Sequence, residues 1–421
     1  EAEVFRVSRS ETEALFEANR LKQVQTHETS GTALRIVKEG RIGFSASNKA
    51  NGDQELITMA LEMAPFGTEA KFEFPCPDSY PDVEVYDPSM EAVSEEYMIG
   101  LGQSLIDKVR GNTLDLICEA GVSKSVTTIE IMNSRGGKAT YQKSVFGIGI
   151  EGVLIRGTDM LFVGDSESSC SPVIDLGAVY SNTIEQLERA KRISPAPAGK
   201  LPIIFTPHGV ASALVMPLVL AVNGKTVLQG ASPLGNRKGE RVFDPGLSIR
   251  DDATINLRPG SRICDDEGVP SQHTSLVENG VVAGFLYDLQ SAAQAGTQST
   301  GSASRGLGSL PVPAVGTLVI EDGDTDFEDM LADIKEGLIV EQLMGASQGN
   351  VLGGDFSGNV ILGYKVENGE ILGRVKDAMV SGNIYETLSE IEAVGRDGRW
   401  VNGILRIPHL YCPRVVVSAQ G

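Results

Sequence analysis

Two short loops, residues 299–304 and 355–358, combine small polar residues with glycine and are the strongest candidates for binding chemistry in this sequence. Small residues let a second backbone approach closely, because no large side chain collides with it. Main-chain hydrogen bonds can then hold an extended peptide with little regard to its sequence. The candidate peptide-binding residues are Thr300, Gly301, Ser302, Asp355 and Ser357.

The alternative interpretation is that the glycines in both loops only make tight turns. A Gly301→Val substitution separates the two ideas. We expect it to block a groove lined by both loops while leaving the fold intact, unless Gly301 has a positive φ.

Three adjacent acids, Asp265, Asp266 and Glu267, precede a Gly-Val-Pro turn. Carboxylates grouped in this way are able to bind a cation. A run of like charges is more often a solvated surface, and glycine followed by proline is typical of a turn. We therefore expect a solvated turn here in preference to a cation site.

The four histidines of the chain do not form a recognisable ligand set. His27 lies beside Glu28, His273 follows the acidic turn at 265–267, and His208 is expected near the start of a helix. None of the five cysteines forms a Cys-x-x-Cys pair. His409, Cys412 and His208 could in principle make an irregular metal site, but we favour a half-buried strand end. There is no P-loop and no Gly-x-Ser-x-Gly motif, and a Gly-x-Gly-x-x-Gly match at 147–152 lies within a strand-like run.

Composition excludes some classes of partner. The 421 residues carry a formal net charge of -20, which repels phosphate backbones and argues against direct nucleic-acid binding. Dispersed cysteines, no signal peptide and no long apolar stretch predict a cytoplasmic protein with reduced thiols and no membrane span.

The elements that must position these residues are mostly strands. Residues 2–10 and 13–19 alternate and are predicted to be antiparallel neighbours, and Asn279-Gly280 predicts a hairpin. Helices are predicted over residues 94–110, with Ser94 as the cap, and over 206–222, starting at Thr206-Pro207. Further helices are expected over 183–193, 287–295, 324–335 and 384–391.

The chain is long enough for two domains, and Ser194-Pro-Ala-Pro-Ala-Gly199 has the composition of a connector. We predict an N-terminal α+β domain over 1–194, a linker over 195–200 and a C-terminal domain over 201–421. The fold class is α+β. The first domain is expected to be an antiparallel sheet with helices, and the second mainly β, as a twisted sheet or partly closed barrel with a few helices.

Two ordered blocks of sequence resemble the TldD/PmbA family, known as modulators of DNA gyrase and as a two-subunit metallopeptidase. The resemblance covers most of the chain, and in the 299–302 loop Ser302 stands where the family usually has Asn. The matching segments are Asp265-Asp-Glu-Gly-Val-Pro270, Val277-Glu-Asn-Gly-Val281, Ser299-Thr-Gly-Ser302, Gly353-Gly-Asp-Phe-Ser-Gly358, Glu367-Asn-Gly-Glu370 and Ser381-Gly-Asn383.

In this family, the metal-bearing TldD-type subunit has His-Glu-x-x-x-His on the first helix of the second domain and a Cys near the C-terminus. His208 matches the first histidine. Gly209 stands at the glutamate position, Ala213 at the second histidine and Val394 at the cysteine. The chain therefore resembles the PmbA subunit, also called TldE, and we expect it to bind no metal and to carry no catalytic residue of its own.

The resemblance implies a role in proteolysis of unfolded peptides, with zinc on a TldD-type partner and an extended peptide held between the subunits. We expect a dimer, with itself when alone and with the partner when present. It also implies that the natural chain begins before Glu1. Two alternatives stay open: a stand-alone hydrolase with another metal site, and a regulatory protein that binds gyrase or a toxin–antitoxin pair.

Overall fold

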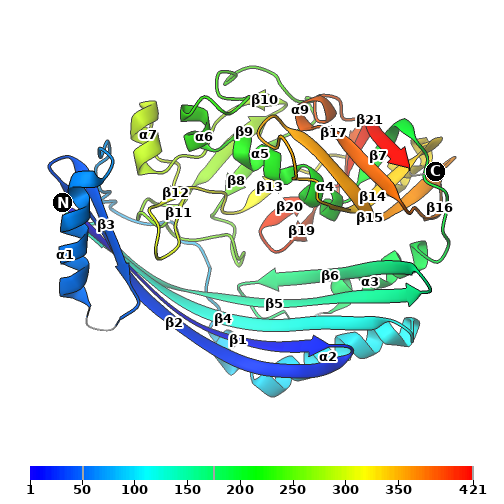
Figure 1. Cartoon of the computed structure of the whole chain (residues 1–421), viewed down its shortest axis with the longest axis horizontal. Helices are drawn as coiled ribbons and strands as arrows, with labels where there is room; N and C mark the ends of the chain where they lie inside the picture. The colour runs from blue at the N-terminus through cyan, green and yellow to red at the C-terminus, as the bar shows by residue number, and fades with distance from the viewer. Residues whose placement is uncertain (50–51, 174–175, 420–421) are drawn as a thin grey trace.

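The first part of the chain forms one six-stranded antiparallel sheet of long, curved strands, shown in blue to green in Figure 1. The computed structural model describes residues 1–49, 52–173 and 176–419. The strand order is β3-β2-β1-β4-β5-β6, and the antiparallel sheet expected for this part is confirmed. The strands are β1 (Ala2–Glu17), β2 (Arg20–Lys38), β3 (Arg41–Ser47), β4 (Ile117–Asn133), β5 (Lys138–Arg156) and β6 (Asp159–Ser169).

The prediction that residues 2–10 and 13–19 form two neighbouring strands was wrong, because β1 runs unbroken from Ala2 to Glu17. The segment between them, Glu11-Thr12, contains no turn residue. The chain reverses instead at Ala18-Asn19, where both residues have positive φ values of 48° and 71°. Two successive positive φ angles are what a tight hairpin turn requires, so β1 pairs with β2.

Helices cover one face of this sheet. Ser94 caps the longest of them as expected, since its hydroxyl accepts a hydrogen bond from the Tyr97 N–H at 3.1 Å. Leu105 and Val109 of that helix are fully buried against the sheet. The helices are α1 (Asp53–Met63), the 3₁₀ turns η1 (Ala64–Phe66) and η2 (Pro88–Ala92), α2 (Glu95–Asn112) and α3 (Gly177–Arg189), which starts earlier than predicted.

The second part is built on a closed five-stranded barrel. Strand β14 pairs with both β7 and β15, which closes the order β14-β7-β21-β17-β15 into a ring. This confirms the expected β-rich second part with a barrel. The barrel strands are β7 (Gly199–Phe205), β14 (Glu336–Met344), β15 (Asp355–Glu367), β17 (Ala378–Asn383) and β21 (Leu410–Ala419); β16 (Glu370–Arg374) and β18 (Ala393–Val394) pair at its margin.

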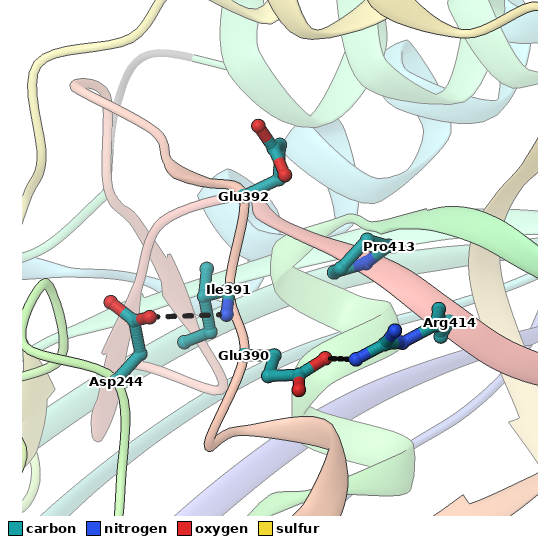
Figure 2. Close-up of a pocket in the computed structure, with 6 residues that line it drawn as sticks. All are labelled: Asp244, Glu390, Ile391, Glu392, Pro413 and Arg414. Atoms are coloured by element: carbon teal, nitrogen blue, oxygen red, sulfur yellow. Dashed lines mark hydrogen bonds and ion pairs between the residues drawn. The ribbon is translucent and has the colours of Figure 1, made fainter.

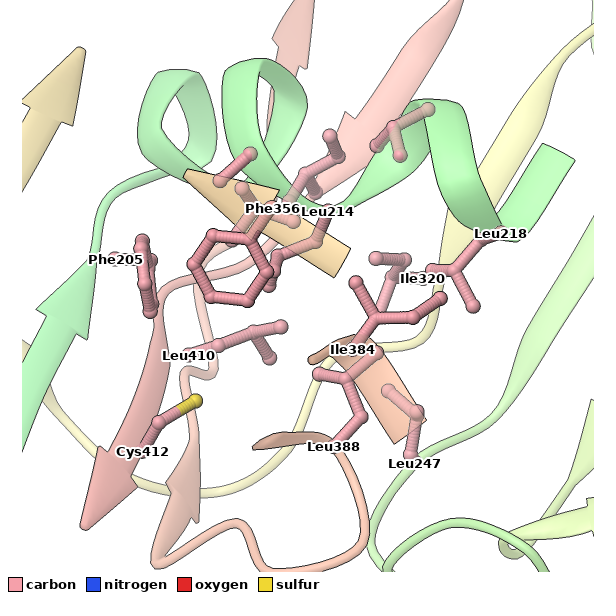
Figure 3. Packing of buried hydrophobic residues seen from close by; sticks show 14 of the residues in the cluster. Phe205, Leu214, Leu218, Leu247, Ile320, Phe356, Ile384, Leu388, Leu410 and Cys412 are labelled. Carbon is pink, nitrogen blue, oxygen red and sulfur yellow. The ribbon is translucent and has the colours of Figure 1, made fainter. Parts of the chain in front are cut away.

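A second, smaller sheet lies beside the barrel, and the two share an apolar core. Figure 3 shows this core, where Phe205 and Phe356 from barrel strands face Leu214 and Leu218 from helices. The smaller sheet has the order β10-β9-β8-β13-β20-β19. Its strands are β8 (Ile249–Asp252), β9 (His273–Glu278), β10 (Val281–Val282), β13 (Leu318–Ile320), β19 (Arg399–Val401) and β20 (Leu405–Ile407), and β11 (Ala303–Ser304) pairs with β12 (Val312–Pro313).

The helices of the second part are short. The helix predicted over 206–222 is broken at Leu214 into two pieces, because Pro217 has no N–H to bond to the carbonyl of residue 213. The helix predicted to end at Ile391 stops at Thr387. The helices are α4 (Pro207–Ala213), α5 (Val215–Ala221), α6 (Gly224–Leu228), α7 (Leu289–Ala295), α8 (Phe327–Asp333) and α9 (Ile384–Thr387).

The predicted hairpin at Asn279-Gly280 is present. Both residues have positive φ, 48° and 78°, and they join β9 to β10. The short helix that follows also ends as predicted, because Gly296 adopts the left-handed conformation at the end of α7. These two features fix the course of the chain that leads into the loop at 299–304.

The chain changes from the first sheet to the barrel between β6 and β7. Buried side chains nevertheless pack across this change, since one core cluster joins Leu105 and Ile148 to Ile339 and Tyr364. Two independently folding domains divided at 195–200 therefore stay a prediction. Within the described part of the chain, none of the helices combines the length and apolar character needed to cross a membrane.

Candidate functional site

The loop at 299–304 is packed against the chain itself. Thr300 donates its N–H to the Tyr287 carbonyl at 3.1 Å and accepts the Tyr287 N–H on its hydroxyl at 2.8 Å. Ser302 is buried, and its carbonyl accepts the Ala314 N–H at 2.8 Å. These bonds fix the loop beside the start of α7.

Gly301 has the positive φ that would undermine its use as a simple test position. Its φ is 65°, and a Cβ there would lie 2.6 Å from the Pro270 carbonyl oxygen. The close backbone approach that this glycine permits is thus made by Pro270 of the same chain. A valine at 301 would strain the fold as well as fill any groove.

The other predicted loop opens strand β15. Asp355 and Ser357 are exposed while Phe356 between them is buried, as expected for alternate residues of a strand. Asp355 accepts a hydrogen bond from the Asn383 amide at 2.8 Å. No hydrogen bond among the described residues joins this segment to the 299–304 loop, and Figure 1 places β11 on the side of α6 and α7 and β15 nearer the C-terminus. The structure does not bring the two loops together; peptide binding by either stays a prediction.

The expectation of a solvated turn at 265–267 was wrong. Asp265 and Glu267 are fully buried. Asp265 accepts the N–H groups of Glu267, Val269 and Ala303 at 2.9–3.0 Å, so it organises the turn from inside. Carboxylates taken out of water need such partners, because burying a charge without them is costly.

Glu267 belongs to a buried ion-pair network with Glu3, Arg35 and Arg305. Arg35 donates to Glu267 at 2.6 Å and to Glu3 at 2.9 Å, and Arg305 lies 2.9 Å from the other oxygen of Glu3. All four side chains are at most 2% exposed. Burial raises the pKa of Glu267, and the charge of Arg35 opposes that rise. This network ties strands β1 and β2 to the turn at 265–267 and to the loop after β11.

A second polar cluster joins the two parts of the chain around His208, at the start of α4. The imidazole Nε2 lies 3.1 Å from the Asp165 carboxylate of β6. The other oxygen of Asp165 accepts the Asn182 amide of α3 at 2.6 Å, and Asn182 accepts Arg399 of β19 at 2.7 Å. We call these four residues the His208 cluster.

The charge state of His208 follows from its neighbours. Burial lowers the pKa of this histidine, but the hydrogen bond and charge of Asp165 more than offset that effect and raise the pKa above its usual 6.5. The imidazole Nε2 points to a carboxylate, so this nitrogen is engaged in a hydrogen bond and is not free to bind a metal. Nearby, burial lowers the pKa of His409 to about 4, and its ring packs on Phe327 at 4.9 Å between centroids.

The residues at the other positions of the metal motif pack against the barrel or lie in the apolar core. A Cβ at position 209 would lie 2.2 Å from the Val340 carbonyl oxygen of β14, so the glycine allows α4 to sit tightly on the barrel. Ala213 and Val394 are buried in the same apolar cluster as Val210. Across residues 1–49, 52–173 and 176–419, no three His, Cys, Asp or Glu side chains group as a metal site would require. The residues present do not fit a zinc ion.

A shallow surface pocket of about 350 Å³ lies near the C-terminal strand, and Figure 2 shows its lining. Glu390 pairs with Arg414, and Asp244 accepts the Ile391 N–H at 3.4 Å. Glu392 and Pro413 complete the lining. The lining combines three carboxylates with one arginine and contains no histidine, cysteine, serine or lysine.

Local sequence patterns contain little sign of either polar network. Asp165 and His208 are 43 residues apart on different elements, and no local pattern links them. Glu3 did carry a signal, because it alternates with Phe5 on the side of β1 that turns inward. A charged residue on an apolar row is an indication of a buried partner.

Comparison with known proteins places these features in a family. Residues 198–419 match the family model described as the PmbA/TldA metallopeptidase C-terminal domain, and residues 2–64 match that of PmbA/TldA metallopeptidase domain 1. An uncharacterized protein of Methanocaldococcus jannaschii is 28% identical over 397 residues, covering 93% of this chain and 90% of the relative. A protein of Methanothermobacter thermautotrophicus named metalloprotease is 26% identical over 409 residues, covering 91% and 86%.

The fold also has a solved counterpart. The crystal structure of TldE from Thermococcus kodakarensis superposes with a TM-score of 0.88 and covers 100% of this chain and 97% of that one. At 24% sequence identity, this likeness establishes the shared fold.

Proposed function

This chain belongs to the PmbA/TldD metallopeptidase family, and from that premise we propose that it is the subunit without metal of a two-subunit peptidase. In this proposal a TldD-type partner carries the zinc ion and performs hydrolysis. The present chain completes the chamber and helps to hold an extended, unfolded peptide. The assembly is cytoplasmic, and the chain pairs with itself only when the partner is absent.

The observation that carries the proposal is the packing at Gly209. A catalytic zinc site needs several protein ligands and a carboxylate that handles the proton of water. Here the carboxylate position has no room for a side chain, because the Val340 carbonyl occupies the space. The two further ligand positions are occupied by Ala213 and Val394, whose side chains are buried in the apolar core.

His208 then has a structural role in place of a catalytic one. Its imidazole Nε2 pairs with the carboxylate of Asp165 across the join between the first sheet and the barrel. A charged hydrogen bond of this kind fixes how the two parts are oriented. In this proposal the hydrogen bonds of the His208 cluster hold the first sheet and the barrel in one relative orientation, which sets the shape of the chamber wall.

The test is reconstitution with the TldD-type chain of the same organism. Each chain is purified alone and in a mixture, and zinc content and cleavage of an unfolded peptide are measured. We expect zinc and cleavage to require the TldD-type chain, with this chain raising the rate. One zinc ion per molecule of this chain that survives dialysis, or cleavage by this chain alone, would refute the proposal.

Peptide holding by Asp355 and Ser357 is tested in the same mixture. Both side chains are exposed, so Ser357→Trp adds bulk at the surface without disturbing the core. Ser10→Trp, at an exposed position of β1, is the matched control. We expect the first variant to slow cleavage with unchanged assembly and melting temperature. Equal rates for both variants would remove these residues from the binding surface.

A further inference from the structure

The face of β4, β5 and β6 that is turned away from the helices, and that packs on the second part at the other end of the sheet, carries an apolar strip at its free end. Register places Ile117 opposite Val153, and Val153 opposite Phe162, while Ile155 lies opposite Met160. These five residues are here called the apolar strip. Their sequence neighbours, among them Cys118, Leu154 and Leu161, point to the other face and are buried.

The strip breaks the usual pattern of a sheet that has one side in water. Such a sheet alternates apolar residues inward with polar residues outward. In the strip both faces are apolar, with Ile117 and Phe162 each 42% exposed, Met160 48% and Ile155 52%. These four side chains expose on the order of 300–400 Å², which is comparable to the largest apolar patch of a typical monomer, a patch that is often functional.

Two carboxylates lie beside the strip without compensation. Glu119 and Glu151 are directly opposite each other on adjacent strands, two residues along from Ile117 and Val153. Both are exposed, and neither takes part in a hydrogen bond or ion pair among the described residues. The charge of Glu119 acts on Lys22, but Lys22 forms its ion pair with Glu17, at 2.5 Å. Like charges directly opposite each other destabilise a sheet, so a cation placed between them would be favourable.

We propose that this face docks a different chain, the TldD-type subunit, through an apolar centre and a lysine or arginine that inserts between Glu119 and Glu151. A second copy of this chain is the poorer occupant. It would bring further carboxylates to the acid pair, and each copy carries a net charge of -20. The strip would form the centre of an interface of roughly 800 Å² per partner. This inference rests on the proposed pairing with a TldD-type subunit.

The experiment measures the dissociation constant of the full-length chain and the purified TldD-type subunit of its own organism at low and high salt. Phe162→Asp tests the apolar centre, and we expect it to weaken binding by about 30-fold or more, as for a central aromatic anchor. The Glu119→Lys, Glu151→Lys double variant should weaken binding and remove its salt dependence. Ser8→Asp, at an exposed position of β1, is the control and should bind as the wild type does.

Each result decides a separate question. If the wild type binds and both variants bind equally well, the docking face is refuted while the proposed function stands. If Phe162→Asp instead turns a dimer of the isolated chain into a monomer with unchanged binding of the TldD-type subunit, a second copy occupies the face. If the wild type fails to bind the TldD-type subunit, the proposed function itself is refuted. Because Phe162→Asp could unfold the sheet, the charge variant, on exposed positions, supplies a second test, and thermal melting of each variant checks the fold.

Discussion

Replacing Arg35 by methionine tests the buried ion-pair network most directly. Arg35 is the one residue of the four that bonds to both Glu3 and Glu267, and its guanidinium also lies 4.7 Å from the ring centre of Phe72. Methionine keeps much of the aliphatic packing but removes the charge and all donors. Glu267 is then left with the Leu289 N–H as partner, and Glu3 with Arg305.

The cost follows from the burial of these groups. Removing one partner of a buried pair leaves an uncompensated charge and typically costs about 3–5 kcal/mol. The carboxylates have a way to reduce that cost, which is to bind a proton. Burial already raises the pKa of Glu267 and Arg35 opposes the rise, so losing Arg35 raises that pKa further. We therefore expect about 3–5 kcal/mol of lost stability at pH 8 and a smaller loss as the pH falls towards 5.

Urea unfolding gives the free energy of unfolding, followed by circular dichroism and by the fluorescence of Trp400, the single tryptophan. Trp400 lies in β19, so it reports on the second part of the chain, where Arg258 covers its ring at 4.2 Å. Arg9→Met is the control, since Arg9 is an exposed partner of Glu11 and its loss should cost less than about 1 kcal/mol. A loss below about 1 kcal/mol for Arg35→Met at pH 8 would refute the reasoning.

Three further predictions concern single residues. Asp165→Asn should abolish a small pH-dependent contribution of His208 to the free energy of unfolding. Because the pKa of His208 is raised in the folded protein, this contribution is fully present below pH 6.5 and is lost as the pH rises through the folded-state pKa. Urea unfolding midpoints between pH 5 and 8 measure the contribution, and a pH profile equal to that of the wild type would contradict the prediction. Gly209→Glu should not create zinc binding and should lower the melting temperature, since its Cβ meets a carbonyl oxygen at 2.2 Å; elemental analysis and calorimetry check both. Gly301→Val should destabilise the fold by about 1–3 kcal/mol through its positive φ and its contact with Pro270, and unfolding equal to the wild type would show that the loop relaxes freely.

Local signals in the sequence were enough to predict several elements. Ser94 caps α2, Asn279-Gly280 turns a hairpin and Gly296 ends α7, because each depends on the dihedral or hydrogen-bonding preference of one or two residues. Thr206-Pro207 likewise predicted the helix start that carries His208, and the many short strand-like runs of the second part predicted a β-rich fold with a barrel. Such features require no knowledge of distant parts of the chain.

Features that depend on distant contacts were predicted poorly. The acids at 265–267 look like a solvated turn until Arg35 and Arg305 are brought to them from elsewhere in the sequence. Strand β1 continued through a polar centre because β2 and β4 pair with it on both sides. Asp165 gave no signal, since its partner His208 is placed by the packing of α4 on β14. Tertiary contacts, which no short window contains, decided each of these cases.

The buried network also bears on the order in which the chain is made. Arg35 leaves the ribosome well before its partner Glu267, because 232 residues separate them. At synthesis rates of about 5–20 residues per second, that wait lasts roughly 10–50 s. Throughout it Arg35 can bind Glu3 of the same sheet, but its Nη1, which binds Glu267 in the finished fold, has to be hydrated by water. The Arg35 guanidinium loses this hydration when the turn at 265–267 reaches it, so closure of the two parts is a late step of biosynthesis.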